Sequence, residues 1–282
     1  MRSVTVLIAA FFCFSLVQPQ ARADVYSETI DTVIESVNNV TDILFPGVTN
    51  IRLGLGPVVS PDYEGSDEYR VRPLPLVSFR YRDLLEVNNN NLRVNLFGFD
   101  SGDKTRRFKA GPQIRVDLGR DENDNPALAG LGEVDIGVEL GLFGSYQLGP
   151  ARTRIRILHD IAGGHSGTKI IGDVRFLVLK KNKLVVTGSL SSTWADSTYM
   201  DSYFAVNPPQ SLASGLPVFN TGAGIKDVRA VMTANYELSP RWAVLAQAGY
   251  KRLLGDAADS PIVSMRGSAN QATAGVFLIL GF

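Results

Sequence analysis

The chain has 282 residues, of which 45% are hydrophobic, and its 28 basic and 28 acidic residues give a formal net charge of zero. This length allows one large barrel or two ordinary domains. The balanced charge excludes the basic surplus that is typical of nucleic-acid-binding proteins.

The N-terminus has the features of a secretory signal peptide. A positive residue, Arg2, precedes an uncharged apolar run from Val4 to Val17, and Ala21-Arg22-Ala23 matches the A-x-A cleavage pattern. We therefore predict that residues 1–23 are removed by cleavage after Ala23.

The rest of the composition limits the available chemistry. Cys13 is the one cysteine and lies in the apolar run, so the mature chain is predicted to have no disulfide and no thiolate site. No later segment reaches the ~18 uncharged apolar residues of a transmembrane helix. Export without cysteines or apolar helices indicates the outer membrane of a Gram-negative bacterium.

Residues 24–50 differ from the chain that follows. Apolar residues recur at spacings of three and four, which predicts an amphipathic helix. These residues are Ile30, Val33, Ile34, Val37, Val40 and Leu44. The segment has five acids and no base: Asp24, Glu28, Asp31, Glu35 and Asp42. We expect a periplasmic helix packed under the rim of a barrel; a plug and a partner-binding helix are the alternatives.

From residue 51 to 282 polarity changes at every second residue, most clearly between residues 105 and 160. This period predicts β-strands with one apolar and one charged face. Strands are expected at 51–60, 69–82, 83–88, 91–98, 106–118, 133–148, 151–161, 168–181, 183–194, 225–237, 240–252 and 270–282. Their lengths suit an all-β, transmembrane antiparallel β-barrel of about twelve strands, within a range of ten to fourteen.

The lengths of the connections support this barrel. Short turns are expected at 149–150, 181–182 and 239–240, and long loops at 61–68, 119–132, 195–224 and 253–269. The short turns then fall at one end of the barrel and the long loops at the other, as in outer-membrane barrels. Pro73 and Pro75 predict a local break in the ladder, because proline cannot donate a hydrogen bond to a neighbouring strand.

Aromatic residues near the strand ends predict the two girdles of a membrane barrel. They are Trp194, Tyr236, Trp242, Tyr250 and Phe282. The terminal Phe282 is also typical of barrels that the outer-membrane assembly machinery recognises. The apolar faces are therefore expected to contact lipid.

The charged faces are predicted to line the lumen as a network. Its members are Arg72, Arg80, Arg107, Lys109, Arg115, Glu133, Asp135, Glu139, Arg152, Arg154 and Arg156. Pairing about the 119–132 loop is expected to place Arg115 near Asp135 and Gly111 near Glu139. Opposed charges of this kind brace a barrel. The alternative is that the arginines on strands two and seven line a narrow path for anionic solutes.

Two other patterns contain residue types found in enzymes or ion sites. His159-Asp160 and His165-Ser166 suggest a hydrolase, but parity places His159 on the outer face, away from Asp160, so ordinary rim residues are favoured. The acidic stretch 117–124 lacks the spacing of a calcium loop. We predict no catalytic residue, metal site or cofactor. A second acidic loop, with Asp62, Glu64, Asp67 and Glu68, is hypothesised to bridge to lipopolysaccharide through divalent ions.

Five sequence stretches resemble the MipA/OmpV family of outer-membrane proteins. They are Pro61–Leu76, Tyr199–Phe204, Ser211–Pro217, Ala223–Val228 and Leu253–Val263, in the family's order. The family motif in the first stretch comprises Tyr63, Glu64, Gly65, Ser66, Asp67, Tyr69, Arg70, Arg72, Pro73 and Pro75. The helical extension over 24–50 departs from the family's pattern.

The resemblance implies an outer-membrane barrel without catalytic residues. One family member is described as a scaffold that joins a lytic transglycosylase to a penicillin-binding murein synthase, and others as adhesive or immunogenic surface proteins. The leading hypothesis is therefore an envelope scaffold linked to murein enzymes on the periplasmic side. A narrow small-solute pore and an adhesin that acts through the 195–224 loop are the alternatives.

Overall fold

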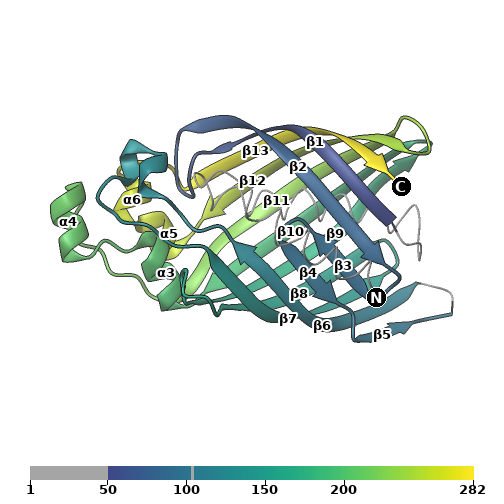
Figure 1. Cartoon of the computed structure of the whole chain (residues 1–282), viewed down its shortest axis with the longest axis horizontal. Coiled ribbons are helices and arrows are strands. Elements are labelled where there is room, and N and C mark those ends of the chain that lie inside the picture. Colours follow the sequence, from purple (N-terminus) through teal and green to yellow (C-terminus); the bar gives the residue numbers. More distant parts are fainter. Residues whose placement is uncertain (1–49, 103–104) are drawn as a thin grey trace, which may run out of the picture.

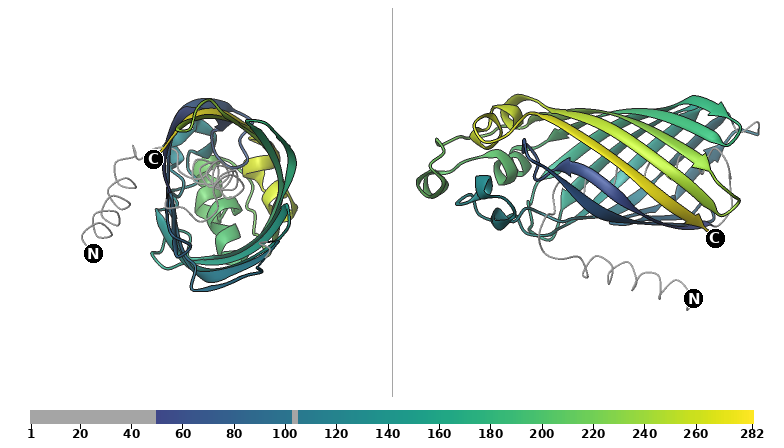
Figure 2. Two further views of the ribbon diagram at one scale, coloured as in Figure 1. Left: turned by 90° about the vertical axis from the view of Figure 1, so that its right-hand side faces the viewer. Right: turned by 90° about the horizontal axis from the view of Figure 1, so that it is seen from above.

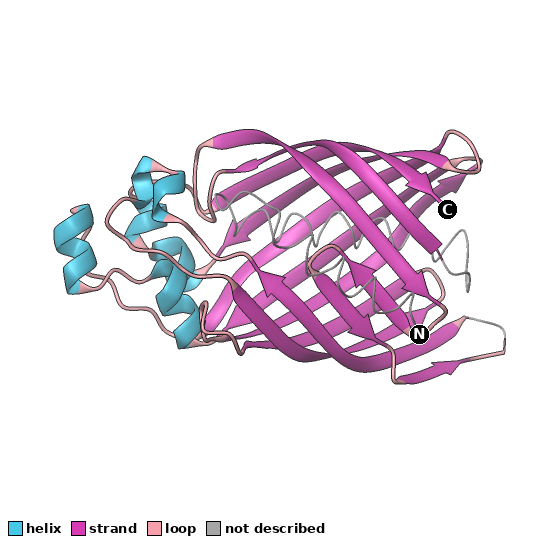
Figure 3. Cartoon of the chain, in the orientation of Figure 1, coloured by secondary structure: helices cyan, strands magenta, loops and turns pink. Residues whose placement is uncertain are grey.

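The computed structural model describes residues 50–102 and 105–282, and these residues form a β-barrel with short helices at one end (Figures 1 and 3). The predicted signal peptide and the predicted helix over 24–50 lie outside the described residues, except that Asn50 is the first residue of β1.

The first seven strands are β1 (Asn50–Pro61), β2 (Tyr69–Tyr81), β3 (Leu85–Asn88), β4 (Asn91–Val94), β5 (Phe97–Asp100), β6 (Arg106–Asp117) and β7 (Gly137–Leu148). The remaining six are β8 (Ala151–Asp160), β9 (Thr168–Lys181), β10 (Leu184–Ala195), β11 (Gly224–Glu237), β12 (Trp242–Leu253) and β13 (Asn270–Gly281). The predicted strand at 133–148 begins later than expected, at Gly137.

These strands close into an antiparallel barrel, as predicted. β1 pairs with both β2 and β13, and every other neighbour in the barrel is also antiparallel. β4 and β5 both pair with β6, one after the other along its length, so they share one place in the wall. The thirteen strands therefore occupy twelve places, thirteen less the shared one, and the wall is seen closed end-on in Figure 2.

The period-two pattern decides which side chains face the lumen. In β8, Ile155 and Ile157 are 55% and 48% exposed on the outer face, whereas Arg154 and Arg156 are buried on the inner face. Apolar side chains on the outside of a barrel are stable only against lipid or a partner. The alternation therefore produces a lipid-facing wall around a charged interior.

The helices and long loops lie at one end, called here the loop end, and the tight turns at the other, called the turn end (Figure 1). The helices at the loop end are η1 (Glu122–Asp124), η2 (Pro126–Leu128), α3 (Ser197–Phe204), α4 (Pro208–Ser214), α5 (Gly255–Asp259) and α6 (Pro261–Ser264). This arrangement agrees with the predicted parity of the connections. Among the described helices, none has the length and hydropathy needed to cross a membrane.

The predicted girdle residues lie on the outer face. Tyr236, Trp242 and Phe282 are 48%, 41% and 66% exposed near the turn end. Tyr250 is 49% exposed nearer the loop end, and Trp194, on the neighbouring part of β10, is half-buried. Aromatic side chains thus occur near both ends of the wall, where the membrane interfaces of a barrel lie.

The wall is interrupted beside β2, where Pro73 and Pro75 occur. β3 pairs with β2 only over residues 78–81, so the loop-end half of β2 has no β3 partner. The Asn89 side chain takes the place of that strand: its Oδ1 accepts from Val77 N–H at 2.5 Å and its Nδ2 donates to the Pro75 carbonyl at 2.8 Å. The two prolines occupy an edge at which no donor is required, which explains why they are tolerated.

Replacing Asn89 with glycine is expected to lower the free energy of unfolding by about 1–3 kcal/mol, because Val77 N–H and the Pro75 carbonyl lose their partners. Glycine also accepts the backbone angle of Asn89 (φ 41°), so the loss reports the hydrogen bonds. Urea unfolding in detergent micelles, followed by tryptophan fluorescence, measures the change. Asn220→Gly, at an exposed position, is the matched control; equal stability of the two variants contradicts this account.

Candidate functional site: the buried charge network

Four charged side chains form a compact cluster inside the barrel, near the loop end. Arg115 Nη1 lies 2.7 Å from Glu139 Oε2 and 3.0 Å from Asp117 Oδ2. Lys169 Nζ lies 2.8 Å from Glu139 Oε1 and 3.1 Å from Asp117 Oδ2. The four residues come from the inner faces of β6, β7 and β9, and each side chain is at most 3% exposed. Two cations and two anions therefore neutralise one another away from water.

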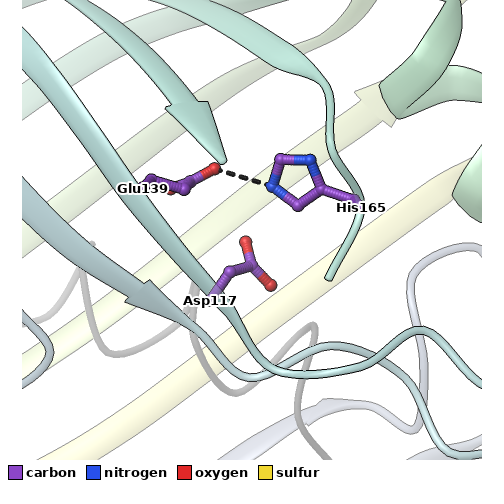
Figure 4. Close-up of side chains that lie close together, drawn as sticks. All are labelled: Asp117, Glu139 and His165. Atoms are coloured by element: carbon purple, nitrogen blue, oxygen red, sulfur yellow. Dashed lines mark hydrogen bonds and ion pairs between the residues drawn. The ribbon is translucent and has the colours of Figure 1, made fainter. Parts of the chain in front are cut away.

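His165 completes this cluster from the loop between β8 and β9 (Figure 4). Its Nδ1 accepts a hydrogen bond from Gly167 N–H at 3.0 Å, so Nε2 is the protonated nitrogen and donates to Glu139 Oε1 at 3.0 Å. Both ring nitrogens are thus used in a neutral tautomer. The imidazole holds the loop against Glu139 and has no free lone pair for catalysis.

The other half of the suggested hydrolase pattern points away from the cluster. His159 is exposed on the outer face and contacts Thr168, as parity predicts. Asp160 is buried and accepts hydrogen bonds from the backbone N–H groups of Ala162, His165 and Ser166. Asp160 therefore shapes the loop that carries His165. His159, Asp160, His165 and Ser166 therefore do not form the hydrogen-bonded chain of nucleophile, base and orienting acid that a hydrolase triad requires.

Helix α3 covers the cluster from the loop end. Asp196 caps its N-terminus by accepting from Tyr199 N–H at 2.9 Å. The Tyr203 hydroxyl donates to Asp117 Oδ1 at 3.1 Å, and the Tyr199 ring packs edge-on against His165 at a centroid distance of 4.8 Å. In the end-on view of Figure 2, α3 lies within the outline of the wall.

A second cluster adjoins the first through Tyr199. Glu64 Oε1 accepts from Lys226 Nζ at 2.5 Å and from Lys251 Nζ at 2.6 Å. Lys226 also lies 3.1 Å from Asp227 Oδ2. The Lys169 and Lys226 ammonium groups lie 4.7 and 5.6 Å from the centroid of the Tyr199 ring, in the range of cation–π contacts. We call the two clusters together the buried network.

Asp117, Glu139 and His165 place three donor atoms within 4.8 Å of one another, which is close enough for a metal ion. The surrounding charges do not suit one. Lys169 and Arg115 already provide positive charge to both carboxylates, and the His165 nitrogens are engaged. A divalent ion would have to displace an ammonium group, so an internal ion-pair network fits this donor set better.

The structure places the predicted lumen residues in two groups. Most pair inside the barrel: Arg72 with Asp62, Arg80 and Arg93 with Glu86, Arg107 with Asp100, and Arg156 with Asp173. Lys109 lies 3.1 Å from Asp83, and Arg152 and Arg154 line a recess described below. Glu133 and Asp135 are exceptions, because both are exposed in the loop before β7.

The expected pairing of Arg115 with Asp135 and of Gly111 with Glu139 is wrong. Arg115 pairs with Glu139, and Gly111 with Phe143. The turn is centred further along the chain than expected, and an isolated bridge between Arg120 and Val134 extends the same register. The shift of four residues is even, so each side chain stays on its predicted face while its partner changes.

The residues of the family motif, which begins in the loop after β1, make contacts that hold the loop end of the barrel together. Tyr63 donates to the Arg266 carbonyl at 2.9 Å; burial, reinforced by the charge of Asp67, raises the pKa of Tyr63 to about 12. Gly65 has φ 98° and lies so close to Val263 that a side chain would clash. Ser66 accepts from Glu68 N–H. Glu64 belongs to the buried network. The other motif residues, Tyr69, Arg70, Arg72, Pro73 and Pro75, lie in β2, where the Tyr69 hydroxyl accepts from Ala272 N–H and Arg70 pairs with Asp62.

Carboxylates of both acidic loops form ion pairs or hydrogen bonds with other residues of the protein. Asp62 is buried against Arg72 and Asn125, and Glu64 belongs to the buried network, so these two carboxylates are engaged within the protein. Asp67 and Glu68 are exposed, and bridging to lipopolysaccharide through divalent ions stays a prediction for them. In the 117–124 stretch, Glu122 accepts from the N–H groups of Gly130 and Gly132. These carboxylates stabilise the loops that carry them.

Several members of the network were not predicted as site residues: Asp117, His165, Lys169, Tyr199, Tyr203, Lys226 and Lys251. Asp117 and Lys251 lie on the charged faces of alternating strands, which is a usable signal. Lys226 has no such signal: it and Asp227 are both buried beside a β-bulge opposite Thr193 and Trp194. A β-bulge changes which side chains point into the lumen, and the alternation of polar and apolar residues in the sequence does not reveal it.

Comparison with solved structures finds outer-membrane porins and channels that are similar to this chain at low sequence identity. The NanC porin (10% identity, TM-score 0.42) aligns over 82% of this chain and 98% of its own. The KdgM porin (9%, 0.38) aligns over 83% and 98%, and the COG4313 outer membrane channel of Pseudomonas putida F1 (9%, 0.43) over 84% and 97%. No curated protein matches the sequence.

The sequence profile described as "MltA-interacting protein MipA" matches residues 53–282, which is most of the chain. The matched region begins within β1 and includes every later strand, the acidic loops and all members of the buried network. The chain therefore belongs to the family of the MltA-interacting protein MipA.

Proposed function

We propose that this barrel is an envelope scaffold, whose turn end faces the periplasm and binds murein-modifying enzymes there. The partners would be a lytic transglycosylase and a penicillin-binding murein synthase. The family description, MltA-interacting protein, supports a partner of this kind. The proposal assigns no catalytic step to the chain.

The observation that best supports this proposal is that side chains fill the lumen at the loop end. In an open channel, charged lining residues are in contact with water. Here the side chains of Glu139 and Lys226 are 0% exposed and that of Arg115 is 2% exposed, under a layer that includes Tyr199 and Tyr203. Side chains, rather than water, surround these charges, which favours a binding role over solute passage.

The turn end offers a surface for a partner. Lys180, Lys181 and Lys183 surround the turn between β9 and β10, and Arg241 lies in the next turn. These turns are adjacent, since Lys183 Nζ donates to the Leu238 carbonyl at 3.5 Å. Exposed cations beyond the aromatic girdle would steer an acidic partner surface toward this end.

A photo-crosslinking residue at Asn182, within this basic turn, is expected to capture a murein-cleaving enzyme in intact cells. The same residue at Leu212, which is 89% exposed in α4 at the loop end, is the matched control and should capture none. Mass spectrometry of the crosslinked bands identifies the partner. If neither Asn182 nor Arg241 captures a murein enzyme, the scaffold proposal fails.

A narrow pore is the second candidate, favoured by a recess of the lumen toward the turn end. Among the described residues that line it, Glu86 is the one acid, and the cations are Arg93, Arg107, Lys109, Arg152 and Arg154. We call it the turn-side recess. A cationic lining of this kind attracts anionic solutes, so the pore predicts conductance that depends on these residues.

A further inference from the structure

The outer face of the wall has an apolar groove that crosses the strands from β8 to β12, toward the loop end. Gly172 on β9 and Ser192 on β10 are partners in the strand register and form its floor. Its sides are larger outward-facing residues, each 42–56% exposed: Ile155, Val174, Leu190, Val228 and Tyr250. The groove has a volume of about 510 Å³, within the range of about 300–1,000 Å³ that is typical of small-molecule sites.

The packing of the wall does not require a glycine at the floor of this groove. A Cβ at Gly172 would meet no atom within 4 Å, so a larger side chain would fit there. The Ser192 hydroxyl donates to the Asp227 carbonyl at 3.0 Å, so its donor is satisfied within the wall and the groove stays apolar. Larger apolar side chains would suit a lipid-facing wall equally well. The hollow is therefore not a requirement of the chain's own packing.

A cation lies at the loop-end edge of the groove. Arg252 on β12 is the register partner of Val228 and is exposed on the outer face. Its Nη1 and the Tyr250 hydroxyl both donate to Asn270 Oδ1, so the three side chains form one polar group beside the groove. Among the described residues, no carboxylate pairs with Arg252. Its charge is therefore available to an anion from outside the chain.

This combination matches the lipid of one leaflet. The long loops of outer-membrane barrels face the outside of the cell, so the groove and Arg252 lie on the side of the outer leaflet. The lipid of that leaflet is lipopolysaccharide, whose lipid A has phosphate groups at the membrane interface and acyl chains below them. A guanidinium group pairs with phosphate through two parallel hydrogen bonds. The apolar groove is suited to an acyl chain.

We propose that this groove is a binding site for one lipid A group of lipopolysaccharide. Arg252 pairs with a phosphate of lipid A, and an acyl chain lies in the groove over Gly172. The site shares with the scaffold function the orientation in which the turn end faces the periplasm. It goes beyond that function, because it lies on the outer face of the wall and requires no periplasmic partner.

Native mass spectrometry of the purified mature chain, released from detergent after incubation with lipid A, tests the site. The native barrel is expected to retain one lipid A. Gly172→Leu should abolish this retention, because its side chain fills the floor of the groove. Arg252→Gln should weaken binding about tenfold, because the charged partner of the phosphate is lost.

Gly144→Leu is the matched control and should bind lipid A like the native barrel. Gly144 is also an outward-facing glycine with no atom within 4 Å of an added Cβ. It lies on the far side of Ile155 from Gly172, outside the groove. Heat-modifiable gel mobility verifies that each variant is folded.

Two other lipids separate the contributions of phosphate and acyl chain. Lipid A without phosphates should bind the native barrel as weakly as lipid A binds Arg252→Gln, and phosphatidylethanolamine should not displace lipid A. Native-level binding of lipid A by Gly172→Leu or by Arg252→Gln overturns the proposal, as does displacement by phosphatidylethanolamine. Capture of a murein enzyme at Asn182 does not depend on these results, so the lipid site and the scaffold function can fail separately.

Discussion

Replacing Glu139 with glutamine is expected to lower the free energy of unfolding by about 3–5 kcal/mol, the usual cost of removing one partner from a buried ion pair. Glu139 accepts contacts from Arg115, Lys169 and His165, and its side chain is 0% exposed. Glutamine keeps the volume but leaves Arg115 and Lys169 to share Asp117. The loss therefore reports charge rather than packing.

Urea unfolding in detergent micelles measures this change, with Trp194 and Trp242 in the wall as fluorescent reporters. Glu133→Gln is the matched control, because Glu133 was predicted from sequence to belong to the same network but is exposed. The control should unfold at the wild-type urea concentration. Equal destabilisation of the two variants would show that the network is not centred on Glu139.

Replacing Gly167 with alanine is expected to destabilise the barrel by about 1–3 kcal/mol through overpacking against α3. A Cβ at this position would lie 2.4 Å from Tyr199 N and 2.6 Å from Tyr199 Cα. The loop or the helix must therefore move, and either movement separates Tyr199 from His165. The Gly167 N–H bond to His165 Nδ1 is weakened by the same movement.

The matched control for this substitution is Gly144→Ala in β7, where an added Cβ has no neighbour within 4 Å. Unfolding measurements on both variants separate the local clash from any general effect of alanine in the wall. A Gly167→Ala variant as stable as Gly144→Ala would show that α3 is not held tightly over the buried network.

The barrel was largely predictable because a membrane wall imposes strict alternation on every strand. Ile155, Arg154 and their neighbours lie on the faces that parity assigns, and the prolines of β2 mark the predicted break. Each of these features depends on residues that are close together in sequence. Local periodicity is sufficient to predict them.

The buried network was less predictable, because its contacts join distant segments. Tyr203 reaches Asp117 from 86 residues away, and Glu64 reaches Lys251 from 187 residues away. Such partners depend on the strand register and on how a long loop folds back into the lumen. The adhesin alternative assigned the 195–224 loop a surface role, and no local pattern indicated that its helix α3 contributes buried aromatic side chains to the interior.

Planar-bilayer recording on the chain from Asp24 to Phe282 tests the scaffold account most directly, since the account requires a lumen that side chains fill. We expect no stable conductance steps from the purified barrel. Stable steps that disappear in the combined Arg152→Gln, Arg154→Gln and Arg156→Gln variant would contradict the scaffold account and identify the barrel as an anion-conducting pore.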